Sequence, residues 1–368
     1  MNMIPRLRTG SALCVLGLAT LSVSADDLLL AVIEFDGLPA GVRLLDPTTG
    51  AMMGDFVAPD FPNNGMLQQV EAISAGPDRT VLFGQPGGNG AIHQYDENGV
   101  FIGVYLGGTP DPNPVDNIRS MTISNDGTFL FTSDWDDSND IHKFNLSDGS
   151  TATGDALGVL IQGSQSAPEL GQPQAIAMTI TGNLLVGDLH RRQIVEYNPN
   201  TGNRIGAFSA LDFTASFQDI DTFIDGGVVV TENGSGDRIR RLDSSGALIE
   251  EFTFSNPDGV HLLPDGSYLV GSGSTSGQGK GLFRVSSTGA ILDVIDSSRS
   301  YGAIELVTLT YTPCIADING DGTLNFFDIS AFLSAFSAGD LSVDFTGDGN
   351  LNFFDVSLFL SAFSAGCP

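Results

Sequence analysis

Short apolar runs separated by turn residues fill the chain from about residue 26 to residue 312. The runs are rich in Val, Ile, Leu and Phe, the breaks between them are rich in Gly, Asn, Asp and Ser, and helical periodicity is absent. Apolar runs of this length, bounded by such turn clusters, are typical of β-strands. The pattern therefore predicts an all-β region that occupies most of the chain.

The strands follow a repeat of ~40–50 residues, a period that occurs in propeller blades. Each copy begins with a strand, an Asp-Gly-type turn and a second strand. This frame recurs in residues 71–84, 119–133, 174–188, 218–232 and 258–272, with the first of these the most degenerate. A third and a fourth strand follow each pair, joined by another turn such as the one that ends at Gly202. Four antiparallel strands per repeat predict a β-propeller blade.

The count of blades comes to six if the two ends of the region share one blade. Residues 28–57 supply only three strands, and residues 303–311 read as the missing first strand. Such a join would close the ring and remove an exposed sheet edge. We expect a six-bladed β-propeller over residues 26–312, and a β-sandwich or a seven-bladed ring are the alternatives.

The last fifty or so residues contain one acidic loop and helix written twice. Residues 317–328 and 344–355 place oxygen-bearing side chains at loop positions 1, 3, 5, 9 and 12 and Gly322 or Gly349 at position 6. Thr323 and Asn350, at position 7, can offer backbone carbonyls. This is the ligand pattern of a Ca²⁺ loop, in which glycine allows the sharp bend. Two copies in tandem predict two Ca²⁺ sites whose occupation is coupled to folding.

An apolar stripe at helical spacing follows each loop. Two such stripes can pack against each other about a pseudo-twofold axis, and Gly339 and Gly366 stand where helix C-terminal caps belong. The stripes consist of Ile329, Phe332, Leu333 and Phe336, and of Val356, Phe359, Leu360 and Phe363. We expect a small α-helical domain over residues 313–368.

This segment resembles a dockerin, the duplicated calcium module that binds a cohesin. The closing Gly366-Cys367-Pro368 and the repeated Phe-Phe-Asp resemble the GC-type variant found at the ends of bacterial secreted proteins. The resemblance implies a cohesin-like or other surface receptor. It implies these calcium ligands: Asp317, Asn319, Asp321, Thr323, Asp328, Asp344, Thr346, Asp348, Asn350 and Asp355.

Aromatic rings stand where cellulosomal dockerins carry small or polar recognition residues. These rings are Phe326, Phe327, Phe353 and Phe354, at loop positions 10 and 11. They either fill the small core of the module or form an apolar docking face, and they put a standard cohesin partner in doubt.

The first 25 residues read as a secretory signal peptide. Arg6 and Arg8 form a basic region, an apolar stretch follows, and Ala25 ends a small-residue cleavage site. The apolar stretch is short for a membrane anchor, which is the alternative. After cleavage Cys314 and Cys367 remain, one on each side of the calcium repeat. Because export permits oxidation, we expect a disulfide between them, with two free thiols as the alternative.

The formal net charge of −29 argues against nucleic acid and anionic membranes as partners. Lysine occurs only at positions 143 and 280. No second apolar run is long enough to span a bilayer after signal cleavage. These features favour a secreted protein that is extracellular or associated with a cell surface.

The blade rhythm is similar to that of NHL-repeat and gluconolactonase-like propellers. In a propeller the first strand of each blade lines the central channel, and the starts of these strands ring one mouth. The positions that fall there are Glu71, Arg119, Gln174, Gln218 and Asp258, with Gly302 or Ala303 in the sixth blade. We expect a polar channel mouth that binds a ligand or only holds water.

A lactonase-like propeller would hold a divalent ion in this channel with carboxylates and asparagines. Glu71 and Asp258 could contribute to such a site, but Arg119 would oppose a cation and no Asn falls in register. The four histidines lie in four different blades and are expected to be solvated strand-edge residues. The sequence shows no nucleophile elbow, P-loop or dinucleotide fingerprint.

The working hypothesis is a secreted calcium-binding protein. Its dockerin-like tail would anchor the propeller, as a recognition module for a glycan or a protein, to an extracellular assembly that binds or degrades polysaccharide. The alternative is an enzyme: a propeller hydrolase, lactonase or lyase with its active site at the channel mouth. A structural surface protein without a small ligand is a third reading.

Overall fold

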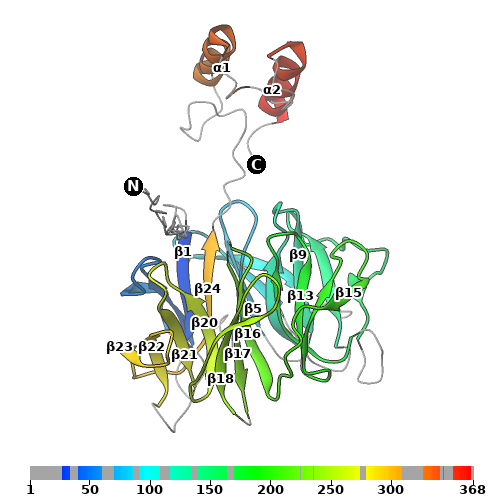
Figure 1. The fold of residues 1–368 in the computed structure, drawn as a ribbon. Helices are drawn as coiled ribbons and strands as arrows, with labels where there is room; N and C mark the ends of the chain where they lie inside the picture. The colour runs from blue at the N-terminus through cyan, green and yellow to red at the C-terminus, as the bar shows by residue number, and fades with distance from the viewer. Residues whose placement is uncertain are drawn as a thin grey trace, which may run out of the picture.

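The computed structural model shows six four-stranded antiparallel sheets and two helices (Figure 1). It describes residues 27–33, 40–59, 70–85, 91–107, 117–134, 139–163, 170–223, 225–234, 236–273, 279–308, 326–339, 343 and 351–365. The six sheets form a six-bladed β-propeller. The prediction of six blades is confirmed, and the sandwich and the seven-bladed ring are excluded.

Each blade is one sheet, numbered here in chain order. Blade 1 contains β24 (Tyr301–Thr308), β1 (Asp27–Ile33), β2 (Gly41–Leu45) and β3 (Met52–Val57). Blade 2 contains β4 (Ala72–Ala75), β5 (Val81–Gln85), β6 (Ala91–Tyr95) and β7 (Phe101–Gly107). Blade 3 contains β8 (Ile118–Ile123), β9 (Phe129–Asp134), β10 (Ile141–Asn145) and β11 (Val159–Ile161).

The remaining three blades have the same strand order. Blade 4 contains β12 (Pro173–Met178), β13 (Leu184–Asp188), β14 (Gln193–Tyr197) and β15 (Arg204–Ala207). Blade 5 contains β16 (Ser216–Thr222), β17 (Val228–Asn233), β18 (Arg238–Leu242) and β19 (Leu248–Thr253). Blade 6 contains β20 (Pro257–Leu262), β21 (Tyr268–Ser272), β22 (Gly281–Val285) and β23 (Ile291–Asp296).

The two ends of the propeller region close the ring within blade 1. Strand β24 pairs antiparallel with β1, and the register places Leu306 opposite Leu29 and Ile304 opposite Ala31. The inner strands β4, β8, β12, β16, β20 and β24 each contact the next one, and β24 contacts β4. The expected sharing of one blade by the two ends is therefore confirmed.

The turns between the third and fourth strands show why these residues form hairpins. In blade 5 the Asp243 carboxylate accepts hydrogen bonds from the backbone N–H groups of Ser245 (2.8 Å) and Ala247 (3.0 Å). Gly246 has a φ of 78°, a conformation that glycine adopts without strain. The degenerate first turn of blade 2 lacks such a glycine, and Asp78 and Arg79 take positive φ values of 52° and 58° instead.

Apolar side chains between adjacent blades form the core. Between blades 4 and 5, for example, Leu185 and Ile194 belong to one cluster with Phe217 and Val230, and all four are completely buried. Because both faces of a blade are covered by its neighbours, the second strands are almost continuous apolar runs such as Val228–Val230. The ring thus fixes the inner strands around a common axis.

The two helices of the tail are α1 (Phe326–Ala338) and α2 (Phe353–Ala365). Phe332 and Phe359, equivalent positions in the two copies, stack with ring centroids 4.1 Å apart and planes 3° apart. Ile329, Phe336, Val356 and Phe363 pack around this stack. The predicted pairing of like stripes is confirmed, and Gly339 takes the predicted left-handed cap conformation, with φ of 74°.

The predicted stripe is wrong at one position of each copy. Leu333 is 55% exposed and Leu360 is 51% exposed. The side chains that pack around Phe332 and Phe359 come from three residues before and four residues after each of them. Leu333 and Leu360 each follow one of these rings directly and are rotated away from the contact between the helices. No helix in the described ranges is long and apolar enough to cross a bilayer.

Candidate ligand site in the propeller channel

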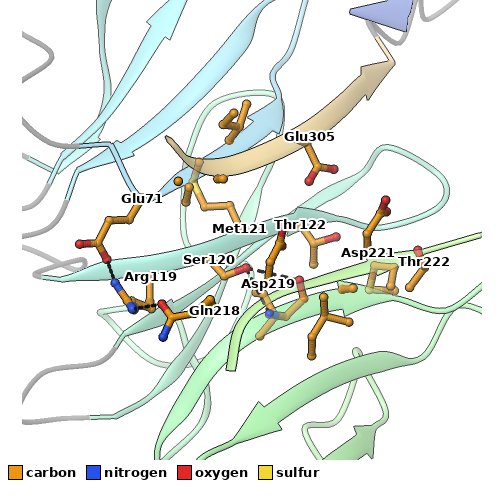
Figure 2. Close-up of a pocket in the computed structure, with 18 of the residues that line it drawn as sticks. Glu71, Arg119, Ser120, Met121, Thr122, Gln218, Asp219, Asp221, Thr222 and Glu305 are labelled. Carbon is orange, nitrogen blue, oxygen red and sulfur yellow. Dashed lines mark hydrogen bonds and ion pairs between the residues drawn. The ribbon is translucent and has the colours of Figure 1, made fainter. Parts of the chain in front are cut away.

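The inner strands enclose a cavity of ≈ 230 Å³ on the propeller axis (Figure 2). Glu71, Arg119, Gln218 and Asp258, four of the five residues that the sequence predicts for the channel mouth, line it together. They come from four blades and from positions far apart in the sequence.

β-Bulges in the inner strands place these side chains. The pairing register shifts between Ile118 and Ser120 in β8, between Phe217 and Asp219 in β16, and between Pro257 and Val260 in β20. The bulged positions include Arg119, Gln218 and Asp258. A β-bulge redirects a side chain and is over-represented next to functional sites. In β8, β16 and β20 the repeated bulge is the local reason why the start of the strand contributes a polar side chain to the cavity.

Arg119 joins three blades at one end of the cavity. Its Nη1 forms an ion pair with the Glu71 carboxylate of blade 2. Its Nη2 donates a hydrogen bond to Gln218 Oε1 of blade 5 at 2.8 Å. Figure 2 shows this chain of Glu71, Arg119 and Gln218 at one end of the cavity. The Arg119 guanidinium is thereby paired with a carboxylate, which reduces the repulsion that it exerts on a positively charged ligand.

Asp258 lies near this end and is held by neutral donors. Its carboxylate accepts hydrogen bonds from Gly273 N (3.0 Å), Asn233 Nδ2 (3.2 Å) and Asn256 Nδ2 (3.3 Å). Burial raises the pKa of Asp258 to about 6, although these hydrogen bonds and Arg119 act in the opposite direction. Asn233 and Asn256 therefore position Asp258, but neither of them is among the residues that line the cavity.

Gln174 departs from the predicted ring. It is 2% exposed and is not among the residues that line the cavity. The register of β12 shifts between Pro173 and Ile176, so Gln174 and Ala175 both fall in the irregular stretch. The Gln174 carbonyl accepts a hydrogen bond from Ser133 Oγ at 3.0 Å, which ties blade 4 to blade 3.

Three further carboxyl groups, which the sequence analysis missed, line the same cavity. They are Asp219 and Asp221 of β16 and Glu305 of β24. Figure 2 shows Asp221 and Glu305 at the end opposite Glu71, Arg119 and Gln218, with Asp219 between the ends. The alternation of Asp219 and Asp221 along an inner strand is the signal that could have revealed them, because residues two apart face the same side of a strand.

Asp219, Asp221 and Glu305 are half-buried in the wall of the channel. Burial, with a smaller contribution from the nearby Asp221, raises the pKa of Asp219 to about 8, although Val260 N donates a hydrogen bond to Asp219 at 3.0 Å. Burial also raises the pKa of Glu305 well above its ordinary value, with Asp221 and Asp219 adding to the effect. At neutral pH Asp219 is therefore mostly protonated, whereas Asp258, with a pKa of about 6, is mostly ionised.

The histidine prediction is wrong for three of the four residues. His93, His142 and His261 are 5%, 3% and 7% exposed. His261 Nδ1 lies 2.8 Å from Asp221 Oδ2, so this histidine contacts one of the carboxyl groups that line the channel. Only His190 is exposed, in agreement with the sequence-based expectation.

Most of the predicted calcium ligands, Cys314, Cys367 and the signal peptide lie outside the described residues. Asp328 and Asp355, at position 12 of the two loops, are described and are both completely buried. Asp355 Oδ2 accepts a hydrogen bond from Asn352 N at 2.8 Å, at the start of α2. Within the described ranges, no three His, Cys, Asp or Glu side chains converge closely enough to hold a metal ion.

The fold and the polar channel define a six-bladed β-propeller with a ligand-sized central cavity, and solved structures share that architecture. A Bacteroides caccae protein of unknown function aligns with a TM-score of 0.52 at 12% identity, covering 75% of this chain and 98% of its own. A chain of a nidogen–laminin complex has a TM-score of 0.57 at 13% identity, covering 76% of this chain and 98% of its own.

A candidate 6-phosphogluconolactonase from Bacteroides fragilis is a third similar structure. It aligns with a TM-score of 0.51 at 14% identity, covering 78% of this chain and 99% of its own. No family model and no curated protein matches the chain. At such identities the likeness shows the propeller fold alone, because unrelated functions share folds of this kind.

Proposed function

We propose that this protein is a secreted calcium-binding protein with two modules. A dockerin-like tail attaches the propeller to an extracellular or cell-surface assembly, and the propeller serves there as a recognition module for a glycan or a protein. The observation that carries the proposal is the duplication of the tail. Equivalent residues of its two acidic loop–helix units have similar degrees of burial.

The exposed side of the tail supports a docking role. Phe326 is 74% exposed and Phe353 is 76% exposed, and these residues occupy the same position in the two copies. Leu333 and Leu360 are also equivalent and exposed. Large apolar side chains that remain exposed on a small module are typical of interaction surfaces. The reading of Phe326 and Phe353 as core residues is therefore less favourable than the docking reading.

The buried side of the tail supports calcium binding. Asp328 and Asp355 are buried at the helix starts, where an ionised carboxylate needs compensation by hydrogen bonds or a cation. In the proposed site the other ligands are Asp317, Asn319, Asp321 and Thr323, with their equivalents in the second loop. A Cys314–Cys367 disulfide would tie the ends of the same module.

The docking role is tested with tagged full-length protein and the envelope and supernatant proteins of the source organism. A partner that is captured in Ca²⁺, and lost with chelator or with Phe326→Ser plus Phe353→Ser, supports the proposal. The matched control is Val100→Ser plus Ile102→Ser, which changes residues 60% and 55% exposed on the propeller. Capture that is insensitive to both chelator and the tail variant contradicts the docking role.

An enzyme is the second candidate, because the channel combines carboxyl groups of different proton affinity. Asp219 and Asp258, with pKa values raised to about 8 and about 6, could act as proton donor and acceptor in a hydrolase, lactonase or lyase. Turnover of a panel of lactones and glycosides, lost in Asp219→Asn, would favour the enzyme. Absence of turnover together with ligand binding favours the recognition module.

A further inference from the structure

Paired charges occupy one end of the channel cavity, and further acidic groups line the rest of it. Among the described residues that line it, Arg119 is the one permanent cation, and it already binds Glu71 and Gln218. Asp219 and Glu305 form no ion pair that the structure records, and Asp221 contacts His261. Burial without a cation disfavours the ionised form of a carboxyl group, so a cationic ligand that enters would stabilise that form.

Part of the wall between the acidic groups is apolar, beside polar residues such as Ser120 and Thr222. The apolar part consists of Ile73, Met121, Ile176, Met178 and Ile220, and none of the described lining residues is aromatic. A chain of methylene groups would bury apolar surface against these side chains.

The acidic groups are spread out rather than focused. Asp221 and Glu305 lie at the end of the cavity opposite Arg119 (Figure 2). Asp258 lines the same cavity and interacts electrostatically with Arg119. No three of the described acidic or histidine side chains converge on a point that would suit a metal ion. The cavity of ≈ 230 Å³ is also smaller than the ~300 Å³ lower bound for pockets that hold drug-sized ligands.

We propose that the channel binds a short aliphatic diamine, with one ammonium group at Asp221 and Glu305, the other near Asp258, and the methylene chain along the apolar walls. This inference rests on the proposed recognition role of the propeller but not on docking of the tail. Ammonium groups donate hydrogen bonds to carboxylates in several directions, which suits oxygens that are distributed along a channel.

Binding of the diamine should release protons, and this release distinguishes it from the binding of an uncharged ligand. With a pKa of about 8, Asp219 is mostly protonated at pH 7, and burial raises the pKa of Glu305 in the same direction. An ammonium group beside these carboxyl groups favours their ionised forms. The diamine enters as a dication, the carboxyl protons leave to the buffer, and no covalent bond changes. Net proton release on binding is therefore expected at pH 7, as is tighter binding as the pH rises toward the pKa of Asp219, which is about 8.

The test is calorimetric titration of the full-length protein, saturated with Ca²⁺, with butane-1,4-diamine in two buffers of different ionisation enthalpy. We expect one site in the propeller, with proton release. Asp221→Asn and Glu305→Gln each weaken affinity about tenfold, as loss of a charge-assisted hydrogen bond predicts. The control is Asp293→Asn, an exposed carboxylate on β23, which leaves affinity unchanged.

Several outcomes would overturn the inference. Equal binding of butane-1,4-diol would mean a site for neutral polyols. Displacement of the diamine by excess Ca²⁺ in a manner sensitive to Asp221→Asn would mean a metal site. Absence of binding at millimolar diamine would mean that the channel takes no such ligand.

If either variant fails to fold, the proton release and pH dependence of the unaltered protein still decide the question. The tail pull-down is scored separately with the Phe326 and Phe353 variants, so failure of the channel site and failure of docking are distinguishable.

Discussion

The propeller and the tail are both built from repeats, but they bury their repeats to very different extents. Each blade is covered on both faces by its neighbours, and apolar stretches of the second strands, such as Val81–Phe83, are completely inaccessible. In the tail, the fully buried hydrophobic residues that the structure describes are Phe332, Val343 and Phe359. Its two 13-residue helices leave large apolar side chains exposed at equivalent positions.

The difference teaches that the two modules depend on different sources of stability. Burial of apolar surface suffices for a ring of six blades, whereas a domain of about 50 residues gains too little from its core and usually needs a metal, a disulfide or a partner. The need for such an additional source of stability is greater because Asp328 and Asp355 each place an acidic group in the small core of the tail. The tail should therefore respond to calcium, and the propeller should not.

Removal of the proposed calcium ligands is the strongest way to break the comparison. Asp317→Ala plus Asp344→Ala, or addition of a chelator, is expected to abolish the tail helices, because each of the two loops would then lose the free energy of ion binding. The propeller's melting temperature should hardly change. Far-UV circular dichroism and limited proteolysis of the full-length protein measure the two parts separately.

The matched control for this variant is Asp78→Ala plus Asp293→Ala, which removes two propeller carboxylates and should leave the tail folded. A large common shift in the melting of both modules would show that they are not independent.

The stacked rings of the tail provide the second test. Phe332→Ala is expected to destabilise the tail by about 3–5 kcal/mol, the usual range for loss of a buried aromatic side chain, and Phe359→Ala by the same amount. Phe326→Ala, which changes an exposed ring, should stay within about 0.5 kcal/mol. Chemical denaturation in Ca²⁺, followed by helical signal, measures all three. Unequal effects at Phe332 and Phe359 would contradict the pseudo-twofold packing.

Closure of the ring is the third test, and it concerns the propeller alone. Ile304 on β24 is 1% exposed, and Ile304→Ala should destabilise the propeller by about 2–5 kcal/mol. Ile291→Ala removes the same atoms from β23, where the side chain is 43% exposed, and should have little effect. Thermal melting with the tail saturated in Ca²⁺ compares the two variants. Similar melting of both would mean that β24 does not hold the ring together.

The sequence predicts the blades well because each turn has a local chemical signature. Gly246 and Asp243 identify a hairpin without knowledge of the rest of the fold. The mouth residues follow from the same frame, so Glu71, Arg119, Gln218 and Asp258 are placed together correctly.

The sequence-based predictions fail where packing between distant parts of the chain determines the position of a side chain. A register shift in β12 leaves Gln174 buried, and no local signal reveals it. Asp219, Asp221 and Glu305 meet only when blades 1 and 5 close around one axis. The exposure of Leu333 and Leu360 depends on how the two helices cross, which the spacing of apolar residues does not determine.

The last expected effect is a dependence of propeller stability on pH that comes from Asp219. Its pKa is raised from 3.8 to about 8 on folding, so its stabilising contribution is complete below pH 4 and is lost as the pH rises through 8. The gain in melting temperature from Asp219→Asn should therefore grow between pH 5 and pH 8, by at most about 1.4 kcal/mol of stability per pH unit. Asp126→Asn is the control: hydrogen bonds from Ser124 and Thr128 hold the pKa of Asp126 below 3.8, so its effect should be constant over this range. Parallel curves for the two variants would mean that the channel carboxyl group is ionised throughout, and the proton release expected on diamine binding would then have no source at Asp219.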